Sequence, residues 1–351
     1  MVISRRSVFP LIAFLLAAST VTAQGTPSGV TASIGATAPV ASVSAPVMGY
    51  FFDGSRNVLQ SITGIPGSGF PGTATPLNAT LVEISPAQDY ALAVLADSGS
   101  AAVVTLDGSG SPPVPLAGAM SGVSLIAISP TGTTALLFSA GSGAAQIFTG
   151  LPQSPSLARQ LDWSALPGNV TALAVDDAGD LALVVAQVGN AVLYAVSGGS
   201  APSAIFGATS VASVKFFPDS RQALAAAPVE QQVIFVQDNG GVPGISILAD
   251  ARIGLSAPQA VAASQDGSRA YVLDGSGVIF SIPLSGGQPA QISCGCAPQQ
   301  LQRMRGRDVF LLTPSLAAPP AVLDAGGDSM RVVLMPVEPP ASAHDSGGNN
   351  L

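Results

Sequence analysis

Few side chains in this sequence are suited to catalysis or to metal binding. Charged residues make up 9% of the 351 residues, Lys215 is the only lysine, and the single histidine, His344, lies close to the C-terminal end. A histidine-based triad and a histidine-rich metal site are therefore not expected. The chain also contains no G-x-S-x-G, G-x-x-x-x-G-K or H-E-x-x-H motif, so none of these catalytic signatures is present.

The chain contains a repeated segment, which is described below, and three of its copies have a charged residue at one position. The aligned copies place Glu83 and Lys215 at the same position, and Arg303 at approximately the same position of the last copy. If the repeats form a ring, this position lines its central channel, where the three side chains would bind a small polar or anionic ligand. The alternative is an ion network, buried or bridged by water, that sets the register of the repeats. The other copies have alanine at this position, namely Ala127, Ala174 and Ala262.

Arg303 begins a short basic run. Because side chains alternate along a strand, Arg303, Arg305 and Arg307 would lie on one face if the strand continues through them. Three guanidinium groups on one face would grip a carboxylate or a phosphate. In a loop they would instead be solvated charges.

Three carboxylates are close together in a segment rich in turn-forming residues. Asp176, Asp177 and Asp180 lie within five residues of one another, and their oxygens are the type of ligand that Ca²⁺ prefers. The spacing lacks the full pattern of a known calcium-binding loop. Aspartate is also an ordinary residue of tight turns. The segment therefore predicts either a Ca²⁺ site or a hairpin turn, and no other cofactor is expected.

Cys294 and Cys296 are the only cysteines. In an oxidising compartment a C-x-C pair can close a small disulfide. We interpret the pair as a local clip on a loop. A redox role and two free thiols are the alternatives, and the C-x-x-C spacing of common redox motifs is absent.

The charge balance excludes two classes of partner. Twelve basic and twenty acidic residues give a net charge of −8 and an isoelectric point near 4.4. Nucleic acids and anionic membrane surfaces are bound by basic patches, which this composition does not provide. Proteins, glycans and small molecules remain as partners.

A unit of three short apolar runs recurs along the chain. A turn of the type Ser/Asp-Pro-x-Gly separates the first run from the second, and a Gly/Ser turn separates the second from the third. Copies anchored at Ser85, Ser129, Asp176, Phe217 and Ser264, with a looser one at Arg303, follow one another at intervals of about 39 to 47 residues, which is the spacing of propeller blades. The copies span residues 81–106, 125–150, 172–196, 213–237, 260–282 and 301–325.

The runs have the composition and length of β-strands. They are rich in Val, Ile, Leu and Phe and are bounded by Gly, Pro, Asp and Ser, whereas no convincing amphipathic helix of 10 residues or more is found. The second run of each unit, for example 90–96 or 181–186, is apolar throughout, so both faces must be covered, as in a strand between neighbouring blades. A fourth segment marked by proline, as in 113–116, 245–248 and 290–293, suits the outermost strand of a blade.

These features predict an all-β protein, a β-propeller of about seven four-stranded blades, with six or eight as alternatives. A hairpin formed by 48–53 and 58–63 adds a seventh unit to the six copies, but it has no obvious innermost strand. Either part of 29–46 supplies that strand, or the last strand, 331–337, closes the ring.

The turn segments also resemble a known group of proteins. ISPTGTTALLF (128–138), FPDSRQALAA (217–226) and SQDGSRAYVL (264–273) are similar to the S-P-D-G hairpins of bacterial secreted β-propellers of the TolB and YVTN types. The resemblance covers nearly all of the chain after the first residues and implies the propeller architecture. Functions in such proteins range from partner docking to hydrolysis, so it implies no particular activity.

The ends of the chain differ from the repeats. Residues 1–23 read as a signal peptide, because Arg5 and Arg6 precede a short apolar stretch and a small-residue cleavage site at 21–23. Residues 24–46 form an Ala/Ser/Thr/Pro-rich segment that we expect to be flexible, 47–337 form the propeller domain, and 338–351 form a tail expected to be disordered. The mature protein is expected to be periplasmic or secreted, monomeric, and without a membrane span.

The sequence therefore favours a non-catalytic propeller that serves as a binding or interaction scaffold at its loop faces or channel mouth. The alternative is a metal-dependent hydrolase or lactonase with a site in the central channel. In that case Glu83 would be the first metal ligand, but no second acidic residue occupies the aligned channel position.

Overall fold

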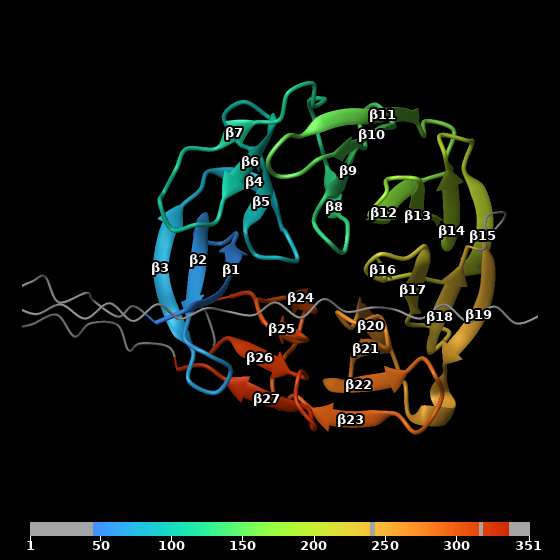
Figure 1. Cartoon of the computed structure of the whole chain (residues 1–351). Helices are drawn as coiled ribbons and strands as arrows, with labels where there is room; N and C mark the ends of the chain where they lie inside the picture. The colour runs from blue at the N-terminus through green and yellow to red at the C-terminus, as the bar shows by residue number, and fades with distance from the viewer. Residues whose placement is uncertain (1–44, 239–242, 316–318, 337–351) are drawn as a thin grey trace, which may run out of the picture. The chain divides into compact units, whose positions relative to one another are not determined.

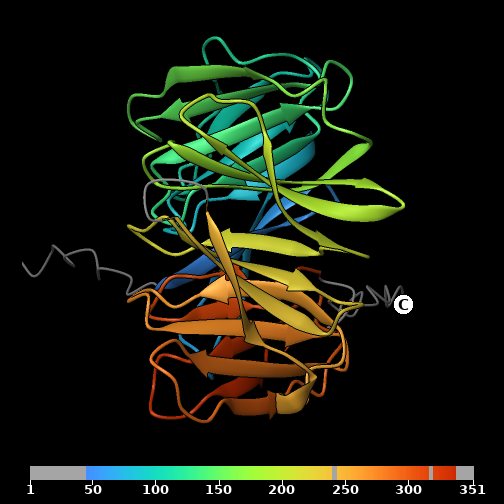
Figure 2. The ribbon, with the colours of Figure 1, turned by 90° about the vertical axis from the view of Figure 1, so that its right-hand side faces the viewer.

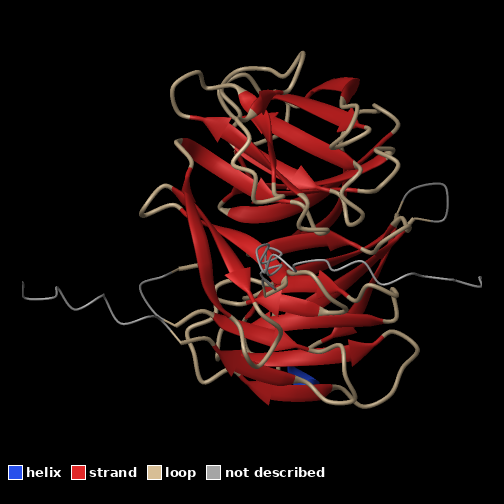
Figure 3. Cartoon of the chain, turned by 60° about the vertical axis from the view of Figure 1, so that its left-hand side comes forward, coloured by secondary structure: helices blue, strands red, loops and turns tan. Residues whose placement is uncertain are grey.

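Seven antiparallel sheets surround a common axis in the computed structural model, as the blades of a propeller do (Figure 1). The structure describes residues 45–238, 243–315 and 319–336. Within these residues the only helix is a single turn, η1 (Ala251–Ile253), and the rest are strands and loops (Figure 3). No helix in this described part is long and apolar enough to cross a membrane. The predicted all-β propeller of seven blades is confirmed.

The blades are numbered along the chain, and their strands follow one another in sequence order across each sheet. Blade 1 consists of β1 (Val47–Asp53), β2 (Val58–Thr63) and β3 (Phe70–Pro76). Blade 2 consists of β4 (Ala79–Ile84), β5 (Tyr90–Leu95), β6 (Ala101–Thr105) and β7 (Val114–Pro115). Blade 3 consists of β8 (Leu125–Ile128), β9 (Thr134–Ser139), β10 (Ala144–Thr149) and β11 (Ser156–Asp162). Blade 4 consists of β12 (Asn169–Val175), β13 (Leu181–Val188), β14 (Asn190–Ser197) and β15 (Ser203–Ala208).

The chain completes the ring with three further blades. Blade 5 consists of β16 (Ser213–Phe216), β17 (Gln222–Ala227), β18 (Gln232–Gln237) and β19 (Gly244–Ala249). Blade 6 consists of β20 (Pro258–Ala263), β21 (Arg269–Asp274), β22 (Val278–Pro283) and β23 (Ala290–Ser293). Blade 7 consists of β24 (Gln302–Arg303), β25 (Val309–Leu311), β26 (Ala321–Asp324) and β27 (Arg331–Leu334).

The second strand of a four-stranded blade is buried on both faces, as its continuous apolar run predicts. In β5, Leu92 packs into an apolar cluster shared with blade 3, whereas Ala91 and Ala93 pack into a cluster shared with blade 1. The first six residues of β13 are likewise all buried. Neighbouring blades therefore cover both faces of such a strand, as Figure 2 shows with the ring seen from its side. This explains the absence of apolar and polar alternation in these runs.

The proline-marked fourth segments lie where they were expected. β7, β19 and β23 are each the last strand of their sheet, at the outer edge of the ring (Figure 1). Pro115 lies in β7, where the missing N–H of proline leaves no hydrogen bond unmade on the free side of the strand.

The core consists of apolar clusters between neighbouring blades. Seven such clusters follow one another around the ring. The cluster between the last blade and the first contains Met48, Phe51 and Ile62 from blade 1, and Met304 and Met335 from the end of the chain. Side-chain packing between blades 7 and 1 therefore closes the ring.

Blade 1 has three strands in the described part of the chain, where four were predicted. Its β1 and β2 correspond to the second and third strands of the other blades, so the described part of blade 1 lacks an innermost strand. One of the two predicted sources is wrong, because residues 331–334 pair with β26 and form the outermost strand of blade 7. The other predicted source, 29–46, lies almost entirely outside the described residues.

The turn between the first and second strands has the same construction in four blades. Its first residue is a buried polar residue whose side-chain oxygen accepts a hydrogen bond from the backbone N–H five residues later. Such a side-chain bond stabilises a tight turn. These first residues are Ser85, Ser129, Asp176 and Ser264.

Gln88 departs from this common turn. The residue three positions after the first is a glycine with positive φ in blades 3, 4 and 6, namely Gly132, Gly179 and Gly267, but Gln88 occupies it in blade 2 with φ 60°. A side chain is strained at this φ, so its presence needs a reason.

That reason is the exposed edge of β1. The Oε1 atom of Gln88 accepts a hydrogen bond from the backbone N–H of Tyr50, and its Nε2 atom donates one to the backbone carbonyl of Arg303. From blade 7, Gln302 Nε2 donates to the Tyr50 carbonyl at 2.7 Å, and the backbone N–H of Arg305 donates to the Met48 carbonyl at 2.8 Å. Among the described residues, groups from blades 2 and 7 thus occupy the inner edge of β1. A backbone edge left unpaired inside the ring would be costly.

Gly49 permits this close contact. A Cβ atom at residue 49 would lie 2.5 Å from Cε of Met304 and 2.9 Å from Oε1 of Gln88. Any larger residue at position 49 would therefore displace the side chains of Met304 and Gln88 that lie against β1.

Candidate functional site

A cavity of about 320 Å³ occupies the central channel. The innermost strands of blades 2 to 7 form its wall, and blade 1 contributes Phe52. Most of the lining side chains are apolar, and the charged ones are Glu83, Lys215 and Arg303. The structure thus places all three residues that the sequence assigned to the channel on the wall of one cavity. Their predicted role in ligand binding stays a prediction.

The strand register agrees with most of the repeat alignment. Glu83 pairs with Leu92 in blade 2, and Lys215 pairs with Leu224 in blade 5. In both blades this is the second residue pair counted from the turn between the first and second strands. Ala127, Ala174 and Ala262 have the same register in their blades. In blade 7, however, the residue in this register is Gln302, because it pairs with Leu311. The alignment was therefore displaced by one residue at Arg303, since the turn of the last copy lacks the common Ser-Pro signal.

Glu83 and Lys215 form an ion pair within the channel. They belong to β4 and β16, in blades 2 and 5, and Nζ of Lys215 lies 3.8 Å from Oε1 of Glu83. This distance is longer than a hydrogen bond, so the two charges attract each other without a shared proton. Solvent reaches 46% of the Lys215 side chain and 37% of the Glu83 side chain. Both groups are therefore open to the channel.

The position of Glu83 deep in the ring alters its acidity. Burial raises the pKa of Glu83 above its ordinary value, and the charge of Lys215 opposes this rise. The protein surrounds the side chain even though the channel admits solvent to it. A carboxylate in this environment gains more from a nearby positive charge than one on the outer surface does.

Arg303 is held against the wall by groups of blades 6 and 7. Its guanidinium group donates to the backbone carbonyl of Ala263, lies 3.4 Å from the carboxylate of Asp308, and stacks over the ring of Phe310 at 5.0 Å. Asp308 is itself buried and accepts hydrogen bonds from the backbone N–H of Gln265 and the hydroxyl of Tyr271. The charge of Arg303 is therefore largely neutralised within the protein.

The predicted face of three arginines does not form. β24 ends at Arg303, so strand alternation does not continue to Arg305 and Arg307. Arg305 turns toward blade 1, where its side chain donates to the backbone carbonyls of Gln88 and Val47. Arg307 is exposed and pairs with Asp266 at 2.9 Å. The chain turns after Arg303 because Gly306 permits a φ of 106° there.

A second cavity of about 410 Å³ lies at one mouth of the channel. The turns between first and second strands line it, and Pro86, Pro130 and Pro218 border both this cavity and the central one. These prolines are the second residue of the turn motif. The repeated sequence thus places three prolines in a collar at the mouth, beside polar and charged residues such as Asp219 and Arg305.

The three aspartates of the predicted Ca²⁺ site point to different partners. Asp176 is buried and accepts hydrogen bonds from the backbone N–H groups of Asp180 and Leu181. Asp177 accepts from Thr131 in blade 3 and from the backbone N–H of Asp219 in blade 5. The described residues contain no group of three His, Cys, Asp or Glu arranged to hold a metal ion.

Asp180, the third of these aspartates, forms an ion pair with Arg159. The segment forms the turn between β12 and β13, and one of its carboxylates bridges three blades. The Ca²⁺ site stays a prediction. Burial raises the pKa of Asp176, against the opposing effect of the hydrogen bonds from Leu181 and Asp180.

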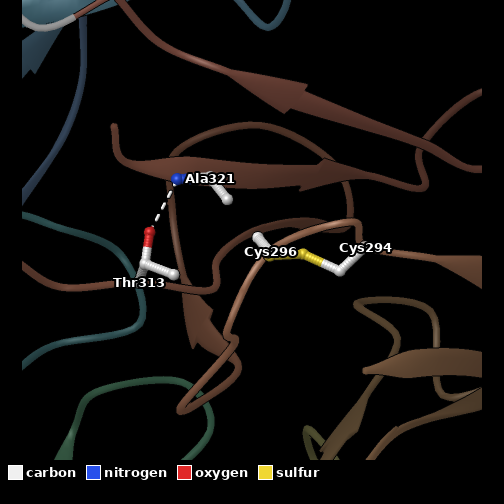
Figure 4. The surroundings of a disulfide bond; sticks show 4 residues. All are labelled: Cys294, Cys296, Thr313 and Ala321. Carbon is white, nitrogen blue, oxygen red and sulfur yellow. Dashed lines mark hydrogen bonds between the residues drawn. A yellow bond between two sulfur atoms is a disulfide. The ribbon is translucent and has the colours of Figure 1, made fainter. Parts of the chain in front are cut away.

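Cys294 and Cys296 are joined by a disulfide in the loop between β23 and β24 (Figure 4). Cys294 is buried in the apolar cluster between blades 6 and 7, and Cys296 packs against the same cluster. Close by in blade 7, the backbone N–H of Ala321 donates to the hydroxyl of Thr313 at 2.7 Å. The disulfide thus fixes the loop that leads into the last blade.

Two important glutamines were not identified from the sequence. Gln88 and Gln302 hold the inner edge of β1, and neither belongs to a recognised motif. The signal for Gln88 was present, since SPAQD in blade 2 has glutamine where SPTGT and SQDGS have glycine. The signal for Gln302 required the register of blade 7, which the alignment had displaced.

No known protein family and no curated protein matches this sequence. Solved structures do resemble the fold. A protein from Lactobacillus plantarum has 15% identity and a TM-score of 0.55, and the match covers 84% of this chain and 97% of that one. Apo AztD from Citrobacter koseri has 13% identity and a TM-score of 0.54, with 84% of each chain covered. The WD40 repeats of RRP9 have 13% identity and a TM-score of 0.52, with 74% of this chain and 81% of that one covered. At these identities the comparisons show the β-propeller fold alone.

Proposed function

We propose that this chain is an exported, non-catalytic propeller that binds a small polar ligand in its central channel. The observation that carries the proposal is the Glu83–Lys215 pair, two solvent-accessible charges in a cavity that is lined mostly by apolar residues. A concave, mainly apolar cavity with a few convergent polar groups is the usual form of a small-molecule site.

The chemistry of the cavity walls supports binding over catalysis. Among the residues that line the two cavities, Glu83 and Asp219 have the only carboxylates, and none is a cysteine or a histidine. The alternative, a metal-dependent hydrolase, needs several oxygen or nitrogen ligands around one ion. Of those two carboxylates, only that of Glu83 lines the central channel.

Two features of the chain support export. The first 23 residues have the charge, apolar stretch and small-residue site of a signal peptide. A disulfide between Cys294 and Cys296 suits an oxidising environment. The similarity of the turn segments to secreted propellers of the TolB and YVTN types points in the same direction.

Retention of a ligand by the purified protein tests the proposal. The mature chain is incubated with an extract of small metabolites, separated from unbound molecules and denatured, and the released compounds are identified by mass spectrometry. Ala260 is partly buried and lines the cavity, so Ala260→Phe fills the channel. Ala204→Phe, on an exposed residue of the outer strand β15, is the matched control.

We expect wild type and Ala204→Phe to retain a compound that Ala260→Phe does not retain. Circular dichroism and thermal unfolding establish that both variants are folded. If Ala260→Phe retains the same compounds as wild type, or if wild type retains none, the channel is not the binding site.

A further inference from the structure

We infer that the ligand of the channel is a small α-zwitterion, such as an aliphatic α-amino acid, which lies antiparallel beside the Glu83–Lys215 pair. This inference rests on the proposed function, because it names the class of ligand for the same site. Its basis is the pairing of one positive and one negative charge, both open to a cavity whose lining residues are mostly apolar.

The separation of the two charges fits such a ligand. Oε1 of Glu83 and Nζ of Lys215 are 3.8 Å apart. In an α-amino acid the ammonium nitrogen and the carboxylate oxygens are about 3 Å apart, as standard bond lengths and angles require. An amino acid can therefore place its ammonium group on Glu83 and its carboxylate on Lys215 without breaking the protein pair. Each of the four charges then has two neighbours of opposite sign.

The hydrogen-bonding capacity of the pair is available to a ligand. At 3.8 Å the Lys215 ammonium group does not donate a hydrogen bond to Glu83. Its three N–H donors, and the carboxylate oxygens of Glu83, can therefore form charge-assisted hydrogen bonds with a ligand. Both side chains are long enough to adjust their positions when it binds.

The charge balance of the channel selects against ligands of a single sign. An anion near Lys215 also lies near Glu83, and a cation near Glu83 also lies near Lys215, so each meets repulsion along with attraction. Arg303 does not alter this balance, because Asp308 and the Ala263 carbonyl hold its guanidinium group. Only a ligand with both charges satisfies both side chains.

The rest of the cavity determines the third substituent of the ligand. Ile84 follows Glu83, Phe216 follows Lys215, and Leu173 lies on the wall formed by blade 4. These apolar residues can pack against an aliphatic side chain of the ligand. The volume of about 320 Å³ is at the lower end of the range for ligand sites. An amino acid or a very short peptide fits this space, whereas a long peptide does not.

Access to the pair comes through the mouth described above. Pro86, Pro130 and Pro218 border both the mouth and the central cavity, so the two spaces are adjacent. The turns form the collar, and two of its long side chains, Arg303 and Arg305, are held by hydrogen bonds to backbone carbonyls. A ligand therefore reaches the pair without an opening of the ring.

Calorimetric titration with matched probes tests the inference. The probes are L-leucine, 4-methylpentanoate (which lacks the ammonium group), 3-methylbutylamine (which lacks the carboxylate) and 6-aminohexanoate (whose two charges are far apart). We expect L-leucine to bind at least about tenfold more tightly than each of the other three, since each lacks a charge-assisted contact. Equal binding of 4-methylpentanoate would identify a simple anion site and overturn the inference.

Two variants assign the contacts. Glu83→Gln should weaken the binding of L-leucine by about tenfold while leaving 4-methylpentanoate no weaker than in wild type. Lys215→Met should have the reverse effect, weakening L-leucine while leaving 3-methylbutylamine no weaker. Arg252→Gln, which changes an exposed arginine within η1, is the control and should have no effect.

The outcomes separate this inference from the proposed function. If none of the four probes binds but the extraction experiment yields a compound that depends on the channel, the zwitterion inference is wrong and the proposed function stands. If the extraction yields no such compound and no probe binds, both are wrong.

Discussion

The side chain of Gln88 in blade 2 accepts a hydrogen bond from the backbone N–H of Tyr50 in blade 1, over a distance of 2.6 Å. The two residues are joined because blade 1 lacks an innermost strand in the described part of the chain. Gln88 adopts a φ of 60° to reach this position, at a point of the turn where three other blades have glycine. The strain is thus compensated by hydrogen bonds to an edge that would otherwise be unpaired.

Replacing Gln88 by glycine should destabilise the protein, even though glycine suits the backbone better. The variant leaves the Tyr50 N–H and the Arg303 carbonyl without partners, at about 1–3 kcal/mol each. Relief of the left-handed conformation returns about 1 kcal/mol. We expect the free energy of unfolding in urea to fall by about 2 kcal/mol. Ala87→Gly, in the same turn, is the control, and equal stability of the two variants would refute the role of Gln88.

Glu83→Gln should change how stability depends on pH. Burial raises the pKa of Glu83, so the folded protein binds this proton more tightly than the unfolded chain does. Wild type therefore loses stability as the pH rises from the ordinary pKa of glutamate through the raised one. Glu83→Gln has no such loss, so the stability of wild type relative to the variant should decrease as the pH rises above about 4.

Glu230 provides a control of opposite sign for this experiment. Although burial acts to raise its pKa, hydrogen bonds from Thr209 hold the pKa of Glu230 below its usual value. The stability of wild type relative to Glu230→Gln should therefore increase as the pH rises. The same slope for both variants would contradict the assignment.

Asp274 should make the protein sensitive to acid. Its burial acts to raise the pKa, but hydrogen bonds from Ser256, Ser276 and the backbone N–H of Ala257 together hold the pKa of Asp274 well below its ordinary value. The stability that it contributes is present above the pKa of an unfolded aspartate, about 4, and is lost as the pH falls further.

Asp274→Asn should therefore be less stable than wild type at pH 7 by at least about 2 kcal/mol. The difference should shrink below about pH 4. Thermal unfolding across this range measures both effects. A difference that is independent of pH would show that the charge of Asp274 is not responsible.

Removal of divalent cations should leave the stability of the protein unchanged. Each of Asp176, Asp177 and Asp180 already has a partner within the protein. Thermal unfolding with EDTA and with added Ca²⁺ should give the same midpoint, and elemental analysis should show no bound Ca²⁺. Asp177→Ala should lower stability by about 1–3 kcal/mol under both conditions. A midpoint that rises with Ca²⁺ in wild type but not in Asp177→Ala would restore the calcium site.

Reduction of the disulfide between Cys294 and Cys296 should have a small effect. The loop that it closes contains only three residues, and in the chain-entropy description such a loop contributes about 1–2 kcal/mol. We expect a reducing agent to lower the melting temperature by about 2–6 °C. The double variant Cys294→Ser/Cys296→Ser should melt at the lower temperature and not respond to reductant. Complete unfolding on reduction would show that the disulfide is essential to the fold.

The architecture could be predicted because it depends on a pattern that is repeated in six of the seven blades. Continuous apolar runs separated by turns specify strands that are covered on both sides, and six copies give the same result. The positions of Glu83 and Lys215 followed from the same alignment. Their approach to 3.8 Å did not, because it depends on the width of the channel and on two side-chain conformations.

The parts that were not predicted are those where the repeat breaks. Blade 1 has no inner strand in the described part of the chain, so the alignment contains no copy from which the contacts of Gln88 and Gln302 could be inferred. The run Arg303–Arg305–Arg307 looked like a strand face because the glycine at 306 was not recognised as a turn. Local patterns therefore identified the elements, whereas contacts between residues more than 200 positions apart required the closed ring.

The closure of this ring also has a consequence for the order of folding. Consecutive blades are connected by short loops, but the contact between Arg305 and Val47 spans 258 residues. Contacts at such separation form only after the intervening chain has become ordered. Three flexible methionines, Met48, Met304 and Met335, fill this joint. The joint between blades 7 and 1 should therefore form last during folding, after the blades that are neighbours in sequence have packed together.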